Sequence, residues 1–142
     1  SWNSWLIMGG ILRIEVPDFE TTFKKNFNLF GSKHEGVGLR HIFGSQEAPW
    51  AVHYEGYSKK RLEKIFTAFG FEIKEVNTNS YKNTYNIEII GKKIKNLNVS
   101  EAKNAAKLYL ADYMVDDSDT EKRMLDVWYN NFEKQLNKTF AI

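Results

Sequence analysis

The side chains best suited to acid–base chemistry gather in one part of the sequence. All three histidines lie between residues 31 and 57, in GSKHEGVGLRHIFGSQEAPWAVHYEGY, together with five glycines and Trp50. An imidazole ordinarily titrates near neutrality, so a histidine can take a proton from a reacting oxygen or nitrogen. A segment this long without helical or strand periodicity is either functional or disordered, and its large apolar residues argue against disorder. The segment is therefore the first candidate for a functional site.

Other chemistry is open to the same segment. Imidazole and carboxylate groups bind zinc and related ions, although their spacings here match no familiar ligand pattern. The groups concerned are His34, Glu35, His41, Glu47, His53 and Glu55. His53 also has a structural alternative, in which it pins the loop by hydrogen bonds to backbone groups. Trp50 and Tyr57 either cover the core or stack against a ligand.

Several kinds of site are disfavoured by what the sequence lacks. There is no cysteine, which removes disulfides, thiolate catalysis and cysteine-bound zinc and fits a reducing compartment. Gly-Val-Gly at 36–38 follows no predicted strand and lacks the third glycine of a dinucleotide fingerprint. The acidic run at 116–119 lacks the glycine and distal glutamate of a calcium loop, and no serine occupies a nucleophile elbow.

Composition and charge indicate the class of protein. The 142 residues are 42% hydrophobic and 15% aromatic, which is enough for the core of one domain. The net charge of +2 comes from interleaved acids and bases, so we expect no nucleic-acid partner. No run of about 18 apolar residues is present, so we expect no membrane span. The start lacks the basic and apolar regions of a signal peptide, and we therefore expect a cytoplasmic protein.

The elements on either side of the histidine segment can be predicted from local patterns. Residues 11–17 form a predicted strand that ends at Pro17, and Asp18 is placed to cap the next helix. In that helix, helical spacing predicts a buried aromatic stripe of Phe19, Phe23, Phe27 and Phe30. After the histidine segment, Ser58 is the N-cap candidate of a helix that stops at Gly70. Its predicted apolar face consists of Leu62, Ile65, Phe66 and Phe69.

The second half of the sequence predicts a hairpin followed by two helices. The alternating runs FEIKEVNT at 71–78 and TYNIEIIG at 84–91 are separated by the turn residues NSYKN, which predicts antiparallel pairing. Ser100 begins the next predicted helix, whose inward residues are Ala105, Leu108 and Tyr109. The residues SDTE at 118–121 have the spacing of a capping box. The helix that follows has an apolar stripe of Leu125, Trp128, Phe132 and Leu136.

These elements and several motifs resemble one family. W-x-x-x-L-x-x-G-G-I-L-R-I-E-V-P-D-F at 2–19 resembles the segment of class I S-adenosylmethionine-dependent methyltransferases in which a helix runs into the fifth strand. H-I-F-G-S-Q at 41–46, His53, G-Y-S at 56–58 and L-x-x-I-F-x-x-F-G-F at 62–71 are similar to the second half of predicted bacterial methyltransferases of the type 11-like group. The resemblance covers residues 2–91, and the last two helices look like a tail in the same group.

The resemblance implies a fold and a domain organisation. It implies an α/β chain with part of a Rossmann-like methyltransferase sheet, in which residues 11–16 are the fifth strand. The hairpin then supplies the sixth and seventh strands, the seventh antiparallel. Residues 1–95 would form the C-terminal half of a methyltransferase-like domain, and residues 96–142 a helical extension packed on it. The chain departs from the family at Ile7 and Met8, where lysine and proline are usual.

The resemblance also implies a function. The chain would be a fragment or half-domain that contributes the acceptor side of a methyltransferase cleft. In the family, a glycine-rich loop and other groups upstream of the matching segment hold the cofactor. We therefore expect this chain to be inactive alone and not to bind S-adenosylmethionine tightly. Carried over residue by residue, His53 is the catalytic proton acceptor, and the acceptor-binding residues are Asp18, Arg40, His41 and Gln46.

Two further functions and a partner complete the expectations. The chain could instead be a non-catalytic binding or assembly module that retains the fold, or a small metal- or histidine-dependent hydrolase. In the family's sheet the fifth strand pairs with the fourth as well as the seventh, so a missing fourth strand leaves a hydrophobic edge along residues 11–16. We expect a homodimer or the missing N-terminal half to cover that edge, with the chain's own amino terminus or last helices as alternatives. Trp2 and Trp5 offer apolar surface for the contact.

Overall fold

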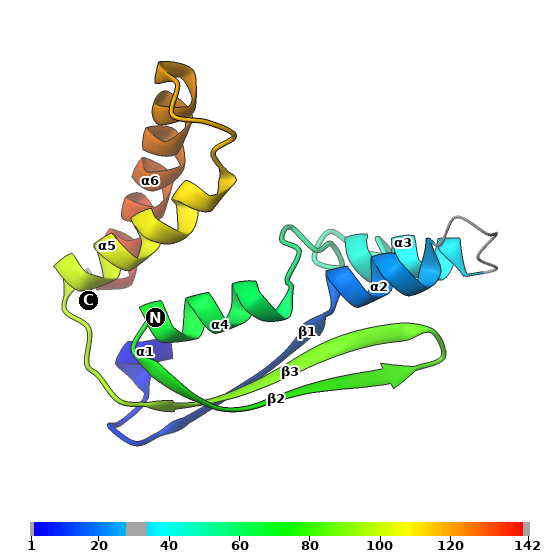
Figure 1. Ribbon diagram of the computed structural model, residues 1–142. Helices are drawn as coiled ribbons and strands as arrows, with labels where there is room; N and C mark the ends of the chain where they lie inside the picture. Colours follow the sequence, from blue (N-terminus) through cyan, green and yellow to red (C-terminus); the bar gives the residue numbers. More distant parts are fainter. Residues whose placement is uncertain (1, 28–33, 141–142) are drawn as a thin grey trace.

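Helices and strands are mixed along the chain (Figure 1). The computed structural model describes residues 2–27 and 34–140, with side chains as far as residue 137. The described elements, in chain order, are α1 (Trp2–Trp5), β1 (Ile11–Pro17), α2 (Phe19–Asn26), α3 (Glu35–Phe43), α4 (Lys59–Ala68), β2 (Phe71–Tyr81), β3 (Thr84–Lys93), α5 (Val99–Leu110), the 3-10 turn η1 (Ala111–Tyr113) and α6 (Asp119–Phe140). The expected α/β class is confirmed as an open three-stranded antiparallel sheet with helices packed on it.

The sheet has the strand order β1-β3-β2, with β3 antiparallel to both neighbours. The two outer strands therefore run parallel to each other, and their carboxyl ends lie at the same end of the sheet. The predicted hairpin is confirmed, but β2 continues to Tyr81, so the turn contains only Lys82 and Asn83. Their φ angles of 45° and 66° are those of a type I′ turn, which matches the twist of the flanking strands.

Helix α4 builds the core on one face of the sheet. Ser58 caps it by accepting a hydrogen bond from the amide of Arg61 at 3.3 Å, and Gly70 follows its end with a φ of 83°. Both predictions are confirmed. Figure 1 shows α2, α3 and α4 along the same side of the sheet, which leaves the other side without a helix in the described part of the chain. The buried core residues are Leu62, Phe66, Phe71, Ile87 and Ile89.

The predicted burial of the aromatic stripe on α2 is wrong. Phe19 and Phe23 are 43% and 56% exposed, whereas the buried residues of α2 are Thr22 and Asn26. Asn26 faces the hairpin, where its Nδ2 donates to the carbonyl of Asn83 at 3.0 Å. The phenylalanine rings stack on one another instead, since helical spacing groups side chains on one face without deciding which face is inward. Phe30 lies outside the described residues.

Helix α3 corrects the expectation that residues 31–57 have no regular structure. It contains two glycines, which lower helix propensity and conceal the helix in the sequence. Gly38 is required by packing, because a Cβ there would lie 2.7 Å from the ring of Phe27 and 2.8 Å from the Cβ of Asn26. Close approach of α2 and α3 thus explains why a glycine sits in the middle of a helix. Residues 44–57 contain no further helix.

The two C-terminal helices are present, with corrections at their starts. Asn98 rather than Ser100 caps α5, and its reciprocal bonds with Glu101 form a capping box. Leu108, expected to face inward, is 65% exposed, while Ala105 is buried as predicted. The box expected at 118–121 is incomplete, because Glu121 accepts from the amide of Val115 rather than from Ser118. The stripe on α6 is confirmed by buried Leu136 and half-buried Leu125, Trp128 and Phe132.

Candidate functional site

A pocket lies where α3 ends, beside the carboxyl end of β1 and the amino end of β3. Its volume is about 370 Å³. Three of the predicted site residues line it together with residues from the following loop and from β3. The lining residues are Arg40, His41, Gly44, Ser45, Trp50, Ala51, His53 and Thr84. The pocket thus lies near the end of the sheet at which the two outer strands, β1 and β2, reach their carboxyl ends.

His53 holds the loop against the end of α3. Its Nδ1 lies 3.1 Å from the carbonyl oxygen of His41 and 3.2 Å from that of Ile42. Its amide donates to the carbonyl of Phe43 at 3.1 Å. The structural alternative for His53, pinning the loop to backbone groups, is therefore confirmed.

The same contacts define how His53 can act chemically. A carbonyl oxygen only accepts hydrogen bonds, so Nδ1 of His53 must carry the hydrogen. In the neutral imidazole, Nε2 then has the free lone pair and is the nitrogen able to take a proton. The His53 side chain is exposed and lines the pocket, so this nitrogen is accessible to a bound molecule. A positional role and a proton-accepting role are thus compatible.

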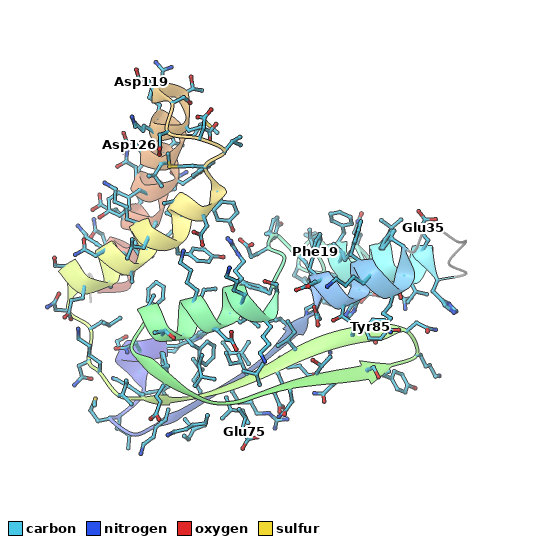
Figure 2. The ribbon with its side chains drawn as sticks, viewed as in Figure 1. Phe19, Glu35, Glu75, Tyr85, Asp119 and Asp126 are labelled. Atoms are coloured by element: carbon cyan, nitrogen blue, oxygen red, sulfur yellow. The ribbon has the colours of Figure 1, made fainter. Side chains whose placement is uncertain are left out.

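His41 is held in the opposite tautomer. Its Nε2 lies 2.7 Å from the carbonyl oxygen of Tyr85, a residue labelled in Figure 2 at the sheet below α2 and α3. Because that oxygen is also an acceptor only, Nε2 carries the hydrogen and Nδ1 is the free acceptor. The bond ties the last turn of α3 to β3. Arg40, next to it, is exposed and makes no ion pair with the described residues.

Two other predicted site residues lie outside the pocket lining. Asp18 is 5% exposed, and its carboxylate accepts hydrogen bonds from the amide of Thr21 at 2.9 Å and from the hydroxyl of Thr21 at 2.6 Å. It is the N-cap of α2, as the sequence predicts. Gln46 has a φ of 56° and donates from its amide to the carbonyl of Ala51, so it shapes the loop. Their predicted roles in acceptor binding stay predictions.

Sequence reasoning missed Ser45 and Thr84 as lining residues. Ser45 follows Gly44, whose φ of 87° and close approach to the carbonyl of Ala51 close the loop on itself. A Cβ on Gly44 would lie 2.3 Å from that oxygen, so the glycine before Ser45 was the available signal of a tight turn. Nothing in the sequence around Thr84 predicts that it lines the pocket. It reaches the pocket because it begins β3, which lies about 30 residues beyond the loop in the chain but beside it in space.

A metal centre is not supported by this geometry. His34 lies at the start of α3, seven residues before His41, and Asn83 Nδ2 lies 3.4 Å from its Nδ1. Among residues 2–27 and 34–140, no three histidine, aspartate or glutamate side chains gather closely enough to hold an ion. The side chains considered as possible metal ligands are thus spread along α3 and the loop.

A second polar cluster anchors the other end of the loop. The guanidinium of Arg61 lies 4.4 Å from the ring centres of both Tyr109 and Tyr113 and pairs with Glu55 at 3.4 Å. The Tyr113 hydroxyl also donates to Glu55. Burial, together with this hydrogen bond, raises the pKa of Tyr113 well above its ordinary range. Arg61 therefore joins α4 to Tyr109 and Tyr113 and to the loop, at Glu55, two residues beyond His53.

Comparisons with models of known families, with curated proteins and with solved structures found no match to this chain. Among the described residues, no helix has the length and apolar character needed to cross a membrane.

Proposed function

We propose that this chain supplies the acceptor side of an S-adenosylmethionine-dependent methyltransferase. The observation that carries the proposal is the pocket of Arg40, His41 and His53 at the carboxyl end of two parallel strands with an antiparallel strand between them. This is the arrangement that the sequence resemblance implies for the fifth, seventh and sixth strands. The motifs of residues 2–91 and the strand order support the same assignment independently.

Under this proposal the cofactor is held outside this chain, as the resemblance implies. The one candidate glycine set, at 36–38, lies within α3, and Gly38 is packed against α2 rather than open to a ligand. It offers neither a loop of free amides nor space for a nucleoside. The cofactor side of the cleft, under this proposal, belongs to a separate segment or chain.

The contribution of this chain would be to orient an acceptor and remove its proton. Nε2 of His53 is the free acceptor nitrogen, and its ring is held in place through Nδ1. Arg40 offers unpaired donors within the described residues, and the indole of Trp50 offers a flat apolar surface. Such a set suits an acceptor oxygen or nitrogen whose proton leaves as the methyl group arrives.

A non-catalytic binding or assembly module is the second candidate. It is favoured by the structural tasks of the predicted site residues: Asp18 caps α2, and His41 and His53 each bond a backbone carbonyl. Under this proposal the pocket would bind a partner group without any proton transfer. The hydrolase proposed from the sequence lacks a gathered metal-binding set among the described residues.

Two measurements test the methyltransferase proposal. Calorimetric titration of S-adenosylmethionine into the 142-residue chain should show no tight binding, and tight binding would refute the assignment of the cofactor side elsewhere. The coding sequence upstream should encode a segment with the pattern of a strand followed by a glycine-rich loop. An upstream sequence without them would favour the binding module.

The catalytic step is tested in the protein that includes the cofactor half. Replacing His53 with glutamine keeps a side-chain donor but removes the basic nitrogen, so we expect kcat to fall by about 10²–10⁴-fold. His34→Gln is the matched control, because His34 lies at the other end of α3, and it should leave kcat unchanged. Equal kcat values for the His53→Gln and wild-type proteins would show that His53 does not accept the proton.

A further inference from the structure

The segment that carries His53 is attached to three different parts of the molecule. The amide of His53 donates to the carbonyl of Phe43 at 3.1 Å, at the end of α3. The carbonyl of Tyr57 accepts from the amide of Phe19 at 3.0 Å, where β1 passes into α2. Glu55, midway between these two points, is held through its side chain instead. The position of His53 therefore depends on contacts on both sides of it in the chain.

The Glu55 carboxylate meets two donors from distant elements. Its Oε1 lies 3.4 Å from Nε of Arg61 on α4, and its Oε2 accepts a hydrogen bond from the hydroxyl of Tyr113 in η1. The Glu55 side chain is 30% exposed and that of Arg61 is 19% exposed. Both charges are thus partly removed from water, where an ion pair with hydrogen bonds is stronger than at an open surface.

Arg61 is held on α4 by contacts that do not involve the loop. Its guanidinium carbon lies 4.4 Å from the ring centres of Tyr109 and Tyr113, and its Nε donates to the Tyr109 hydroxyl at 3.0 Å. Its Nη2 is buried and has no hydrogen-bond partner in the described part of the chain, so the ring faces hold this end of the side chain. The Tyr113 ring in turn packs 5.8 Å from that of Trp128 on α6. Two donors are therefore already in place where Glu55 binds.

We propose that Glu55 is a positioning residue: its carboxylate, bound by Arg61 and Tyr113, holds the loop so that Nδ1 of His53 stays on the carbonyls at the end of α3. Within the described residues, Tyr54 and Gly56 make no backbone hydrogen bond, so Glu55 is the hydrogen-bonded attachment between His53 and Tyr57. Since the proton-accepting role of His53 belongs to the proposed function, the positioning role rests on that proposal.

The same contacts could instead serve only to attach the C-terminal helices. Figure 1 shows α5 and α6 on the side of α4 away from the sheet. Contacts without Glu55 already join them to α4, because Arg61 stacks on the tyrosine rings and Lys64 pairs with Asp112 at 2.6 Å. Loss of the Glu55 carboxylate should therefore leave these helices in place and change the loop. This difference separates a positioning role from a merely structural one.

The variant Glu55→Ala in the 142-residue chain tests the proposal. At about pH 9, where imidazoles are neutral, nitrogen-15 spectra show which ring nitrogen carries the hydrogen. In wild type, Nδ1 of His53 should carry it, because this atom faces two carbonyl oxygens at 3.1 and 3.2 Å. In Glu55→Ala we expect both tautomers, and exchange of the His53 amide hydrogen about three- to tenfold faster. His41, bonded to Tyr85, should keep its tautomer in both chains.

Three further variants make the test specific. Glu47→Ala removes the other glutamate of residues 44–57, which is exposed, and should leave both measurements unchanged. Glu55→Gln keeps an oxygen that can accept from Tyr113 and Arg61, so it should largely restore the wild-type tautomer. Tyr113→Phe keeps the ring over Arg61 and removes only the hydroxyl donor. Its His53 amide should exchange at a rate between those of wild type and Glu55→Ala.

The positioning role and the proposed function fail separately. An unchanged tautomer and exchange rate in Glu55→Ala would refute the positioning role, while the kcat of His53→Gln would still decide the proton transfer. Equal changes in Glu47→Ala and Glu55→Ala would also refute it, because any change in the loop would then have the same effect. Urea denaturation checks that each variant folds, and Tyr113→Phe decides the question if Glu55→Ala does not fold.

Discussion

The two faces of the sheet are made by alternate residues of the same strands, yet they are stabilised in different ways. On the face under α4, Ile87 and Ile89 are 1% and 0% exposed and contact an apolar core. On the open face, Glu88 between them is almost as buried, at 6%, but accepts hydrogen bonds from Arg13 and Asn77. A helix is thus not needed to bury a side chain, since long polar neighbours can cover a carboxylate and satisfy it.

The difference also explains the electrostatics of the open face. Hydrogen bonds from Asn77 and Arg13 hold the pKa of Glu88 below its ordinary value. The charged form is favoured, because both neighbours donate to it. The apolar face is stabilised by close packing instead. A substitution that changes side-chain volume there should therefore lower the free energy of unfolding more than a charge change on the open face.

The largest effect is expected on the covered face. Phe66→Ala removes a ring that is 2% exposed and packs 5.6 Å from the ring of Phe71, so the free energy of unfolding should fall by about 3–5 kcal/mol. Chemical denaturation measures it. Phe23→Ala, at a ring 56% exposed, is the matched control and should cost under about 1 kcal/mol. Similar losses in the two variants would show that α4 does not hold the core.

An intermediate effect is expected where the sheet meets α4. A Cβ on Gly91 would lie 2.5 Å from a ring carbon of Phe66, so Gly91→Ala should lower the free energy of unfolding by about 1–3 kcal/mol. Gly36→Ala provides the comparison, because nothing lies within 4 Å of its Cβ position and alanine favours the helix α3. That variant should be as stable as the wild type or slightly more stable. A Gly91→Ala chain of undiminished stability would contradict the close contact.

The smallest effect, with a distinct pH dependence, is expected on the open face. A carboxyl whose pKa is lowered in the folded state stabilises the fold above its unfolded pKa of about 4.3, and the benefit is lost as the pH falls through the folded pKa. The stability advantage of wild type over Glu88→Gln should therefore shrink between pH 7 and pH 3. Urea denaturation at both pH values measures it. The control is Glu47→Gln, at an exposed side chain, and its stability relative to wild type should not change between the two pH values. If the stability difference between wild type and Glu88→Gln is the same at both pH values, the Glu88 carboxylate does not stabilise the fold in this way.

Much of the fold was predictable from short stretches of sequence. The strand before Pro17, the helix between Ser58 and Gly70 and the hairpin are each specified by residues within a few positions of one another. Helix α3 was not predicted, because its glycines argue against a helix locally. The contact with α2 explains Gly38, whereas no contact requires a glycine at position 36.

The candidate site was predictable in part. The histidine-containing segment does line a pocket, and Arg40, His41 and His53 meet there. The tautomers of the two histidines depend on the backbone carbonyls of α3 and of Tyr85. The spacing of residues in the sequence does not predict these contacts. Asp18 was predicted both as a cap and as a ligand-binding residue, and the structure shows its carboxylate bonded as the cap.

Alternation, caps and turn residues act between neighbours in the chain, so the order of amino acids alone determined that the strands and the hairpin form and where α4 starts and ends. The inward face of α2, the pocket contribution of Thr84 and the exact length of β2 depended on which distant elements came together. Helical or strand periodicity places side chains on a common face, but only packing against another element decides whether that face is core or surface.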